Sequence, residues 1–413
     1  MLKFISLKEA WDILSSMNIP KISTKRVNVL NSIGCIIAEE VHSNIDIPFD
    51  NIALFDGYAV KAEDVASASH SNPIILKLFN EASSISYGQA KRVSTGEALP
   101  KGANAVVPKE FVKEYEKFIE ITTSVPPYAY VARRGEDVQK ESVLLRKGEI
   151  VDPLKAILLL RSLVEEVLVF NKLNVGLLVI GSELTRDIKM VKNGRVLDIT
   201  SLVVKTFLQG YANVKDYGLL PDEPQIIKKY LIQALMENDL VVTIGGTSVG
   251  SKDLTPKVVR QLGEIIFHGV SIMPGRPVGV GKVEEKLIFM LSGFPVAAYN
   301  EFKLLLEPFI LLKVYGAEIK SIPYKARATR RIPSRLGILE MVRVTLNEIK
   351  GCLYATPLRI RGSGILSSLA YADGIVIVPE ELEGYDENQL LDVYRVEDPW
   401  GAIYVEKNLS QVS

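Results

Sequence analysis

Cysteine and histidine are both scarce in this chain of 413 residues, which contains two cysteines and three histidines. The cysteines, Cys35 and Cys352, lie far apart in the sequence and do not form a disulfide framework. The three histidines, His42, His70 and His268, argue against a histidine-rich metal site. This usage fits a protein of the reducing cytoplasm, and we expect a cytoplasmic localisation.

Charge of one sign and long apolar runs are missing as well. Lysine plus arginine and aspartate plus glutamate both number 49, so the chain lacks the basic footprint of a nucleic-acid binder. The longest apolar stretch, residues 154–170, is interrupted by Lys155, Arg161, Glu165 and Glu166. Such interruptions are typical of a helix with one buried face rather than of a membrane span. We therefore expect no nucleic-acid partner and no membrane insertion.

The pattern of apolar residues, glycines and prolines changes along the chain, which predicts a multi-domain protein of mixed α/β and β structure. Residues 1–45 together with 141–170 are expected to form a helical stalk, and residues 46–140 a β-rich domain inserted into it. Strands and helices alternate over residues 171–315, which predicts a three-layer α/β domain with a mostly parallel sheet. Residues 316–413 are rich in strands and predict a small C-terminal β-barrel, or a sandwich.

The helices of the predicted stalk are expected over residues 6–17, 25–41 and 152–170, where apolar residues recur. A helical stalk exposes an apolar stripe that a second copy of the chain would cover. We therefore expect a homodimer.

The stretch VVTIGGTSVGSKDLTPKVV, residues 241–259, begins as a strand and ends as a helix, with Thr255 as the expected N-cap and Pro256 at the first helical position. It is not a P-loop, because Ser251 stands where that motif needs lysine. Glycines and hydroxyls at the carboxyl end of a strand can hold an anion, although an ordinary strand-to-helix loop fits equally well. The candidate binding residues are Gly245, Gly246, Thr247, Ser248, Gly250 and Lys252.

Further junctions of the α/β region place polar residues near strand ends, where open α/β sheets bind ligands. Glu183 follows the strand GLLVIG and is a reasonable Mg²⁺ ligand, whereas Asp198 precedes a helix and could equally serve as its N-cap. The rigid turn Pro274-Gly275-Arg276-Pro277 presents one guanidinium, and Ser292-Gly293 forms another strand–helix junction. Together they predict a site for a phosphorylated ligand. Phosphoryl chemistry assisted by metal and electrostatics is the enzyme class that remains.

Two stretches of the inserted region each allow a functional and a structural interpretation. Asp56 stands before glycine in ALFDGYAV, and spacing alone favours a plain Asp-Gly turn between strands. Asp137 lies in VARRGEDVQ, which could bind an anion through arginine or form a turn with surface ion pairs.

Seven motifs, taken in order, resemble the MoeA family of molybdopterin molybdenumtransferases, whose eukaryotic relatives include the gephyrin E domain. The motifs are DGYAV (56–60), STGEALPKGANAVVPKE (94–110), RRGEDV (133–138), GSEL (181–184), IGGTSVGSKD (244–253), MPGRPVGVGK (273–282) and RGSGILSSLAYADGIVIVPE (361–380). They extend over nearly the whole chain. The resemblance favours ligand binding by the glycine-rich loop.

The resemblance implies an activity: the insertion of molybdate, or possibly tungstate, into adenylylated molybdopterin, dependent on Mg²⁺ and accompanied by release of AMP. Motif by motif, it implies catalytic roles for Asp56, Asp137, Glu183 and Asp198. The implied metal ligands are Glu183, Asp198 and Asp253. Family members are homodimers of four domains, in which the inserted domain of one subunit faces the α/β domain of the other.

The chain also departs from the family pattern. Ser182 replaces an aspartate in Gly-Asp-Glu-Leu, and Ser201 stands where asparagine is expected. The family sequence Leu-Pro-Gly-Asn-Pro-Val-Ser reads here as residues 291–297, LSGFPVA, with Phe294 and Ala297 in place of Asn and Ser. These changes bear on the substrate rather than on the fold. The alternative function is a non-catalytic molybdopterin-binding or scaffold paralogue, and the sequence does not choose between molybdate and tungstate.

Overall fold

A computed structural model describes residues 4–19, 22–247, 254–318, 321–358 and 362–397, and the chain divides into two compact units. The core unit comprises residues 1–25, 147–149 and 170–413. The inserted unit comprises residues 26–146 and 150–169.

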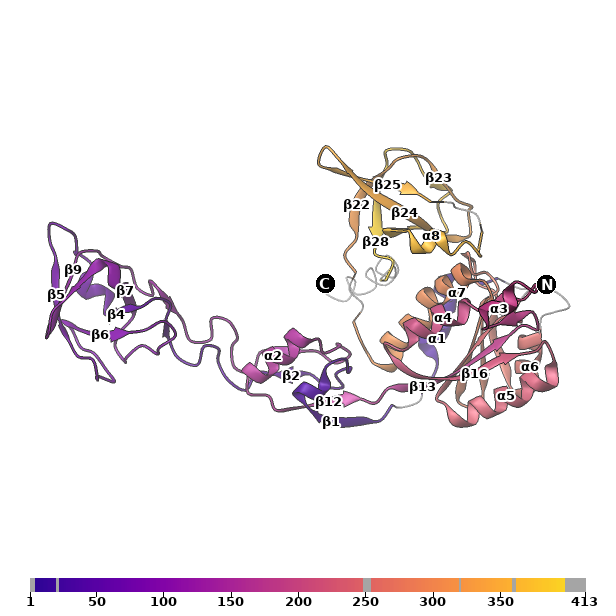
Figure 1. Cartoon of the computed structure of the whole chain (residues 1–413), viewed down its shortest axis with the longest axis horizontal. Coiled ribbons are helices and arrows are strands. Elements are labelled where there is room, and N and C mark those ends of the chain that lie inside the picture. The colour runs from indigo at the N-terminus through magenta and orange to yellow at the C-terminus, as the bar shows by residue number, and fades with distance from the viewer. Residues whose placement is uncertain (1–3, 20–21, 248–253, 319–320, 359–361, 398–413) are drawn as a thin grey trace. The chain divides into compact units, whose positions relative to one another are not determined.

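The core unit contains a six-stranded sheet in the order β16-β13-β17-β21-β20-β18, of which β13 and β16 are labelled in Figure 1. Its strands are β13 (Leu173–Ile180), β16 (Ala212–Leu220), β17 (Leu240–Ile244), β18 (Glu264–His268), β20 (Gly279–Val283) and β21 (Lys286–Leu291). The first four strands in this order pair in parallel, and β20 and β18 complete the sheet in antiparallel fashion. The predicted, mostly parallel sheet is therefore confirmed.

Helices cover both faces of this sheet. They are α4 (Thr200–Leu208), α5 (Pro224–Glu237), α6 (Leu254–Leu262) and α7 (Pro295–Glu301), with the short α3 (Ile188–Val191) and the two-residue strands β14 (Leu184–Thr185), β15 (Val196–Leu197) and β19 (Ile272–Met273) in the connections. Helices α5 and α6 pack together on one face, and α4 and α7 on the other (Figure 1). The central strands β13, β17 and β21 are almost continuously buried, as parallel strands covered on both faces must be.

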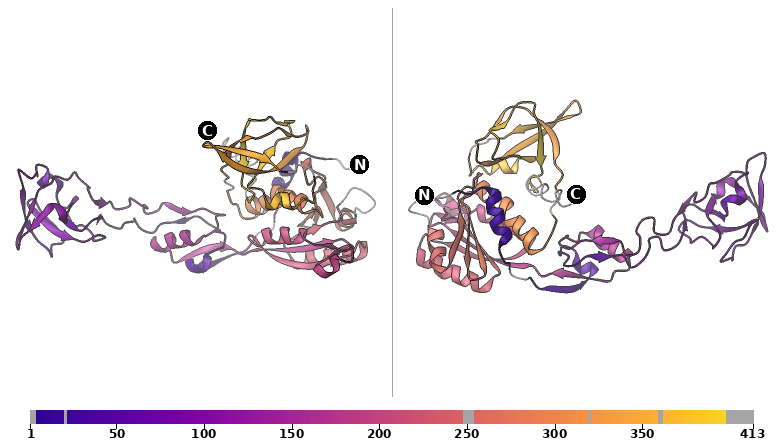
Figure 2. Two further views of the ribbon diagram at one scale, coloured as in Figure 1. Left: turned by 45° about the horizontal axis from the view of Figure 1, so that its top comes forward. Right: turned by 180° about the vertical axis from the view of Figure 1, so that it is seen from behind.

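The first helix, α1 (Leu7–Ser16), packs against the helical segment that follows α7. Ser6 caps it, with Glu9 completing a capping box. The Trp11 indole donates to the Leu304 carbonyl oxygen over 3.0 Å, and Figure 2 shows α1 beside the orange helical segment. That segment continues α7 as π-helical turns over Phe302–Leu306 and Phe309–Val314, so the expected long helix is present with wider turns.

The C-terminal strands close into a barrel. β24 (Leu339–Ile349) pairs with both β25 (Cys352–Pro357) and β26 (Gly374–Val378), and β22 (Tyr324–Ala328) and β28 (Leu390–Tyr394) complete the ring. The connections carry β23 (Ile332–Pro333), β27 (Gly384–Tyr385) and α8 (Ser367–Ala370). Of the two predicted alternatives, the barrel is confirmed. Its interior is filled by small and β-branched residues such as Ala326, Val342 and Val376.

The inserted unit is rich in strands, as expected. Its main sheet has the order β7-β4-β6-β5-β9-β8, formed by β4 (Gly57–Val60), β5 (Ile74–Leu78), β6 (Gln89–Val93), β7 (Ala105–Pro108), β8 (Val112–Glu114) and β9 (Phe118–Ile121). Shorter pairs join β2 (Val41–His42) to β11 (Val143–Leu145), and β3 (Ile52–Ala53) to β10 (Val131–Ala132).

The helical stalk is the part of the predicted fold that is wrong. Residues 25–41 contain β1 (Thr24–Asn28) and a 3₁₀ turn at Val29–Ser32, and residues 166–170 form β12, which pairs with β1. Only α2 (Pro153–Arg161) remains of the helix expected over 152–170. The physical reason is periodicity, because burial in β12 (Glu166–Phe170) alternates every second residue, as in a strand. Residues 1–25 also group with the core unit rather than with a stalk.

Within the described residues, no helix is both long and apolar enough to cross a bilayer.

Candidate functional site

The carboxyl ends of the parallel strands open into a cavity of about 1030 Å³. It lies where β13, β17 and β21 end, the place at which open α/β sheets bind ligands. Its wall brings together residues from all the predicted junctions: Glu183, Asp198, Gly245, Gly246, Thr247, Arg276, Ser292 and Gly293. The prediction that these junctions meet at one rim is thus confirmed.

A second cavity of about 500 Å³ adjoins the first. One wall is the turn formed by Pro274, Gly275 and Arg276, and the opposite wall comes from the barrel, including Ser334, Arg335 and Glu340. Four residues line both cavities: Arg276, Pro277, Ser292 and Phe294. The two cavities therefore share a wall made of two turns.

The two glycines at the start of the glycine-rich loop are required by close backbone packing. Gly245 and Gly246 have φ values of 86° and 66°, and a Cβ on Gly245 would lie 2.4 Å from the carbonyl oxygen of Ile180. Thr255 is not an N-cap, because α6 begins one residue earlier, and its hydroxyl donates to the Gly245 carbonyl oxygen over 3.2 Å. The remaining predicted loop residues, Ser248, Gly250, Lys252 and Asp253, lie outside the described residues.

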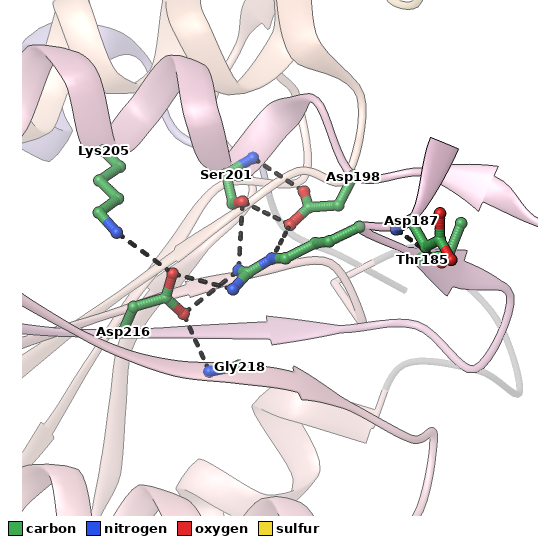
Figure 3. A network of polar contacts seen from close by, with 8 residues as sticks. Thr185, Asp187, Asp198, Ser201, Lys205, Asp216 and Gly218 are labelled. Atoms are coloured by element: carbon green, nitrogen blue, oxygen red, sulfur yellow. Dashed lines mark hydrogen bonds and ion pairs between the residues drawn. The ribbon is translucent and has the colours of Figure 1, made fainter. Parts of the chain in front are cut away.

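Asp198 is enclosed by the protein, with a side chain 1% exposed. One carboxylate oxygen accepts from the Ser201 amide over 3.1 Å, and the other accepts from the Ser201 hydroxyl and from Arg186 Nε, the latter over 3.1 Å (Figure 3). The N-cap position of α4 is occupied by Ile199, whose side chain makes no cap hydrogen bond. Asp198 lies one residue before it and accepts from an amide of the first helical turn, so its contacts are structural although it is not the N-cap itself.

Arg186 joins Asp198 to strand β16. Its guanidinium also forms an ion pair with Asp216, with an NH1–Oδ2 distance of 3.0 Å, and Asp216 receives Lys205 and the Gly218 amide as well (Figure 3). Burial alone would raise the pKa of Asp216, but the Gly218 amide and Arg186 outweigh it and lower that pKa. No sequence pattern points to Arg186, because its partners come from separate elements.

Magnesium can be tested against these donors. The Asp198 carboxylate is already committed to a guanidinium and to two serine donors, and it does not fit the role of a magnesium ligand. Over the described ranges, no group of three acidic, histidine or cysteine side chains is placed to hold a metal ion. Glu183 is exposed and lines the larger cavity. Glu183 and Asp198 therefore do not form a magnesium site by themselves, and Asp253, the third predicted ligand, lies outside the described residues.

Arg276 presents a cation to both cavities. Its guanidinium carbon lies 4.2 Å from the centre of the Phe4 ring, which is a cation–π contact. Its buried Nε has no hydrogen-bond partner among the described residues. A buried donor without a partner is costly, so this group is suited to an anionic ligand.

A carboxyl group that the sequence analysis did not single out lies beneath the shared wall. Glu301, at the end of α7, is completely buried. Its carboxylate accepts from the Ser292 amide over 2.6 Å and from the Ser292 hydroxyl. Burial raises the pKa of Glu301 to about 8, against the opposing effect of the two serine donors.

Asp56 and Asp137 belong to the inserted unit and line neither cavity. Asp56 accepts a hydrogen bond from the Thr95 amide over 2.8 Å and one from the Thr95 hydroxyl over 3.0 Å. The hydrogen bond from the amide is the main reason that the pKa of Asp56 is lowered. Asp137 pairs with Arg161 over 3.1 Å. Both side chains are about half exposed, at 53% and 52%.

Comparison with known proteins covers most of the chain. Residues 5–163 match the MoeA N-terminal region (domain I and II), residues 176–311 a probable molybdopterin binding domain, and residues 325–396 the MoeA C-terminal region (domain IV). A putative molybdopterin biosynthesis protein of Methanocaldococcus jannaschii is 39% identical, over 90% of this chain and 92% of its own. A molybdopterin molybdenumtransferase of Haemophilus influenzae is 31% identical, over 87% of this chain and 90% of its own.

The fold agrees with these relatives. The crystal structure of the molybdopterin biosynthesis MoeA protein of Pyrococcus horikoshii superposes with a TM-score of 0.80 and 31% identity, covering 95% of this chain and 100% of that one. Sequence motifs, domain order and fold therefore agree, and the chain belongs to the MoeA family.

Proposed function

We propose that this protein is a molybdopterin molybdenumtransferase that inserts molybdate or tungstate into adenylylated molybdopterin and releases AMP. The observation that carries the proposal is the wall shared by the two cavities, where Arg276 lines both and its Nε has no hydrogen-bond partner among the described residues. One cavity is large enough for an organic substrate, and the neighbouring one for a small oxyanion.

The chain's own residues supply binding and charge stabilisation. Arg276 pairs with an anionic group of the ligand, and its position between two prolines limits the motion of the turn. Gly245 and Gly246 let the ligand approach the loop backbone closely. Thr200 ties the start of α4 to the same rim, because its hydroxyl donates to the Gly293 carbonyl oxygen over 2.7 Å. No step of this proposal depends on a metal ion, and Mg²⁺ remains a prediction of the family resemblance.

A homodimer is part of the proposal. Helix α2 and the residue pair that follows it expose four large apolar side chains, Leu154 at 78%, Ile157 at 59%, Leu160 at 38% and Leu163 at 60%. Exposed apolar patches of this kind mark protein interfaces, and a second copy of the chain would cover this one. In such a dimer we assign Asp56 to the site of the partner subunit, as the family resemblance implies.

The test is AMP release from adenylylated molybdopterin with each oxyanion in turn. Arg276→Ala should weaken ligand binding by about 1.5–3 kcal/mol, the range for hydrogen bonds to charged groups. Arg260→Ala, an exposed arginine of α6, is the matched control and should behave as wild type. If the wild type binds the substrate but never releases AMP, the scaffold alternative holds instead.

The role of Asp56 is tested by subunit exchange. Asp56→Asn keeps the turn geometry and removes the charge, so the rate should fall on the order of a hundredfold. Mixing Asp56→Asn with Arg276→Ala subunits should restore activity in heterodimers, because one complete site would form. Heterodimers that form without any recovery of AMP release would remove Asp56 from the partner's site.

A further inference from the structure

The wall shared by the two cavities consists of two turns that are far apart in the sequence. One turn, residues 274–277, connects β19 to β20 and carries Arg276. The other, residues 292–294, connects β21 to α7 and carries Ser292. Because each turn lines both cavities, any shift of one against the other changes the shape of both.

The last residues of α7 contact both turns from beneath. Asn300 donates from Nδ2 to the carbonyl oxygen of Pro274 over 2.9 Å. The neighbouring Glu301 accepts from the amide and the hydroxyl of Ser292. One helical turn therefore holds the two turns by three hydrogen bonds.

Packing reinforces these hydrogen bonds at Gly275. Its φ of 123° is one that other residues rarely adopt, and a Cβ there would lie 2.9 Å from Cγ of Glu301. The backbone of the Arg276 turn thus lies directly against the side chain that holds Ser292. Glu301 thus touches both turns through its own side chain.

Burying the polar side chains of Asn300 and Glu301 lowers the stability of the fold. Packing alone therefore does not explain why they are here. Asn300 and Glu301 are completely buried, and the described polar partners of Glu301 are the two neutral donors of Ser292. A buried carboxyl without a cation is destabilising relative to an apolar side chain of the same size. The family pattern has proline at the position of Ser292, which has no amide hydrogen to donate. The Ser292–Glu301 pair is therefore a feature of this chain's version of the turn.

We propose that Glu301 is a positioning residue that fixes the Arg276 turn against the Ser292 turn, so that Arg276 meets an oxyanion in the shared wall. This inference rests on the proposed function. Glu301 does not touch the ligand, and it acts through the two residues that do.

Tungstate binding, measured by calorimetry on the full-length protein, tests the proposal. Glu301→Ala removes both bonds to Ser292 and should raise the Kd for tungstate on the order of tenfold or more. Glu301→Gln keeps an acceptor for the Ser292 amide, and its Kd should stay within about threefold of wild type. Glu301→Asp retains the carboxyl group but shortens its reach, so it should resemble Glu301→Ala and replaces that variant if alanine prevents folding.

Hydrogen exchange separates positioning from a general loss of stability. Glu301→Ala should speed exchange in peptides covering both 274–277 and 292–294. Asp64→Asn is the matched control, because Asp64 is a buried carboxyl that accepts from the Gly88 amide over 2.8 Å in the inserted unit. It should leave both tungstate affinity and exchange in these turns unchanged.

The outcomes distinguish this inference from the proposed function. A wild-type protein that neither binds tungstate nor releases AMP contradicts the proposed function, while the exchange data still report whether Glu301 holds the turns. If the wild type does both, wild-type Kd and wild-type exchange in Glu301→Ala or Glu301→Asp would overturn the positioning role.

Discussion

Two buried carboxyl groups of the α/β region have nearly the same hydrogen bonds but differ in whether a cation is beside them. They are Asp198, at the start of α4, and Glu301, at the end of α7. Each accepts from the amide and the hydroxyl of a single serine, Ser201 in one case and Ser292 in the other. Asp198 also forms an ion pair with the guanidinium of Arg186, whereas the polar partners of Glu301 among the described residues are the two donors of Ser292. The serine contacts are thus shared, and the arginine is the difference.

The presence or absence of a neighbouring cation decides what each carboxyl group can do near the cavities. The charge of Asp198 is balanced within the protein, so Asp198 can remain buried without engaging a ligand. Burial raises the pKa of Glu301 to about 8, so at neutral pH this group is largely a neutral acid. Asp198 is therefore held by an ion pair, whereas Glu301 positions the turns at a cost in folding free energy.

The largest expected effect is the pH dependence of Glu301. Between pH 4.5, its usual pKa, and about 8, the unfolded chain ionises this group while the folded protein keeps the proton. The free energy of unfolding therefore falls as pH rises through this window, and the fall is complete above pH 8. At about 1.36 kcal/mol per pH unit, the free energy of unfolding falls by roughly 5 kcal/mol over this interval.

Glu301→Gln removes this dependence, so its stability should improve relative to wild type as pH rises from 5 to 8. Denaturant unfolding at several pH values measures the difference. Parallel pH curves for the two proteins would show that Glu301 ionises normally in the fold.

The next effect is the loss of Arg186. Arg186→Ala leaves Asp198 buried without a cation, and we expect a loss of about 3 kcal/mol at neutral pH, the lower end of the range for broken buried pairs because Arg186 is 39% exposed. Denaturant unfolding measures it. The double variant Arg186→Ala, Asp198→Asn should recover part of the loss, since the unpaired charge is gone. No recovery would mean that Asp198 needs no counter-charge.

A smaller effect is expected for an ion pair at the surface. Arg161 and Asp137 lie 3.1 Å apart with both side chains more than half exposed. Removing this pair by Arg161→Ala should cost about 0.5 kcal/mol or less in unfolding free energy, because solvent screens it. A loss comparable with that of Arg186→Ala would show that burial is not what separates the two pairs.

The smallest expected effect concerns metal binding. Because Asp198 is committed to Arg186 and Ser201, Asp198→Asn should leave the affinity for Mn²⁺, used as a paramagnetic substitute for Mg²⁺, unchanged within about twofold. Titration followed by electron paramagnetic resonance measures it. A tenfold weaker affinity would return Asp198 to the role of metal ligand.

The sequence predicted the parts of the fold that local patterns determine. The apolar runs of β13, β17 and β21 and the polar residues at their ends placed the cavity correctly. The segment over 164–170 was misjudged, because a short apolar run fits a helix or a strand until its partner is known. That partner, β1, lies more than a hundred residues earlier in the chain.

The two carboxyl networks were beyond sequence reasoning for a related cause. Glu301 lies in the helical sequence PVAAYNEF, where nothing marks it as the group beneath a turn of another element. Arg186 meets Asp216, 30 residues further along, only because β16 lies beside β13. Tertiary contacts decide both, and a single sequence does not reveal them.

The contact between Trp11 and Leu304 fixes an order of events during synthesis. The two residues are 293 positions apart, so at roughly 5–20 residues per second the ribosome needs roughly 15–60 s to supply the partner of α1 after α1 itself is made. Throughout that interval the Trp11 indole lacks its native acceptor, while the inserted unit is completed and can fold. The first helix is therefore made long before the segment against which Trp11 docks, and this contact forms late in synthesis.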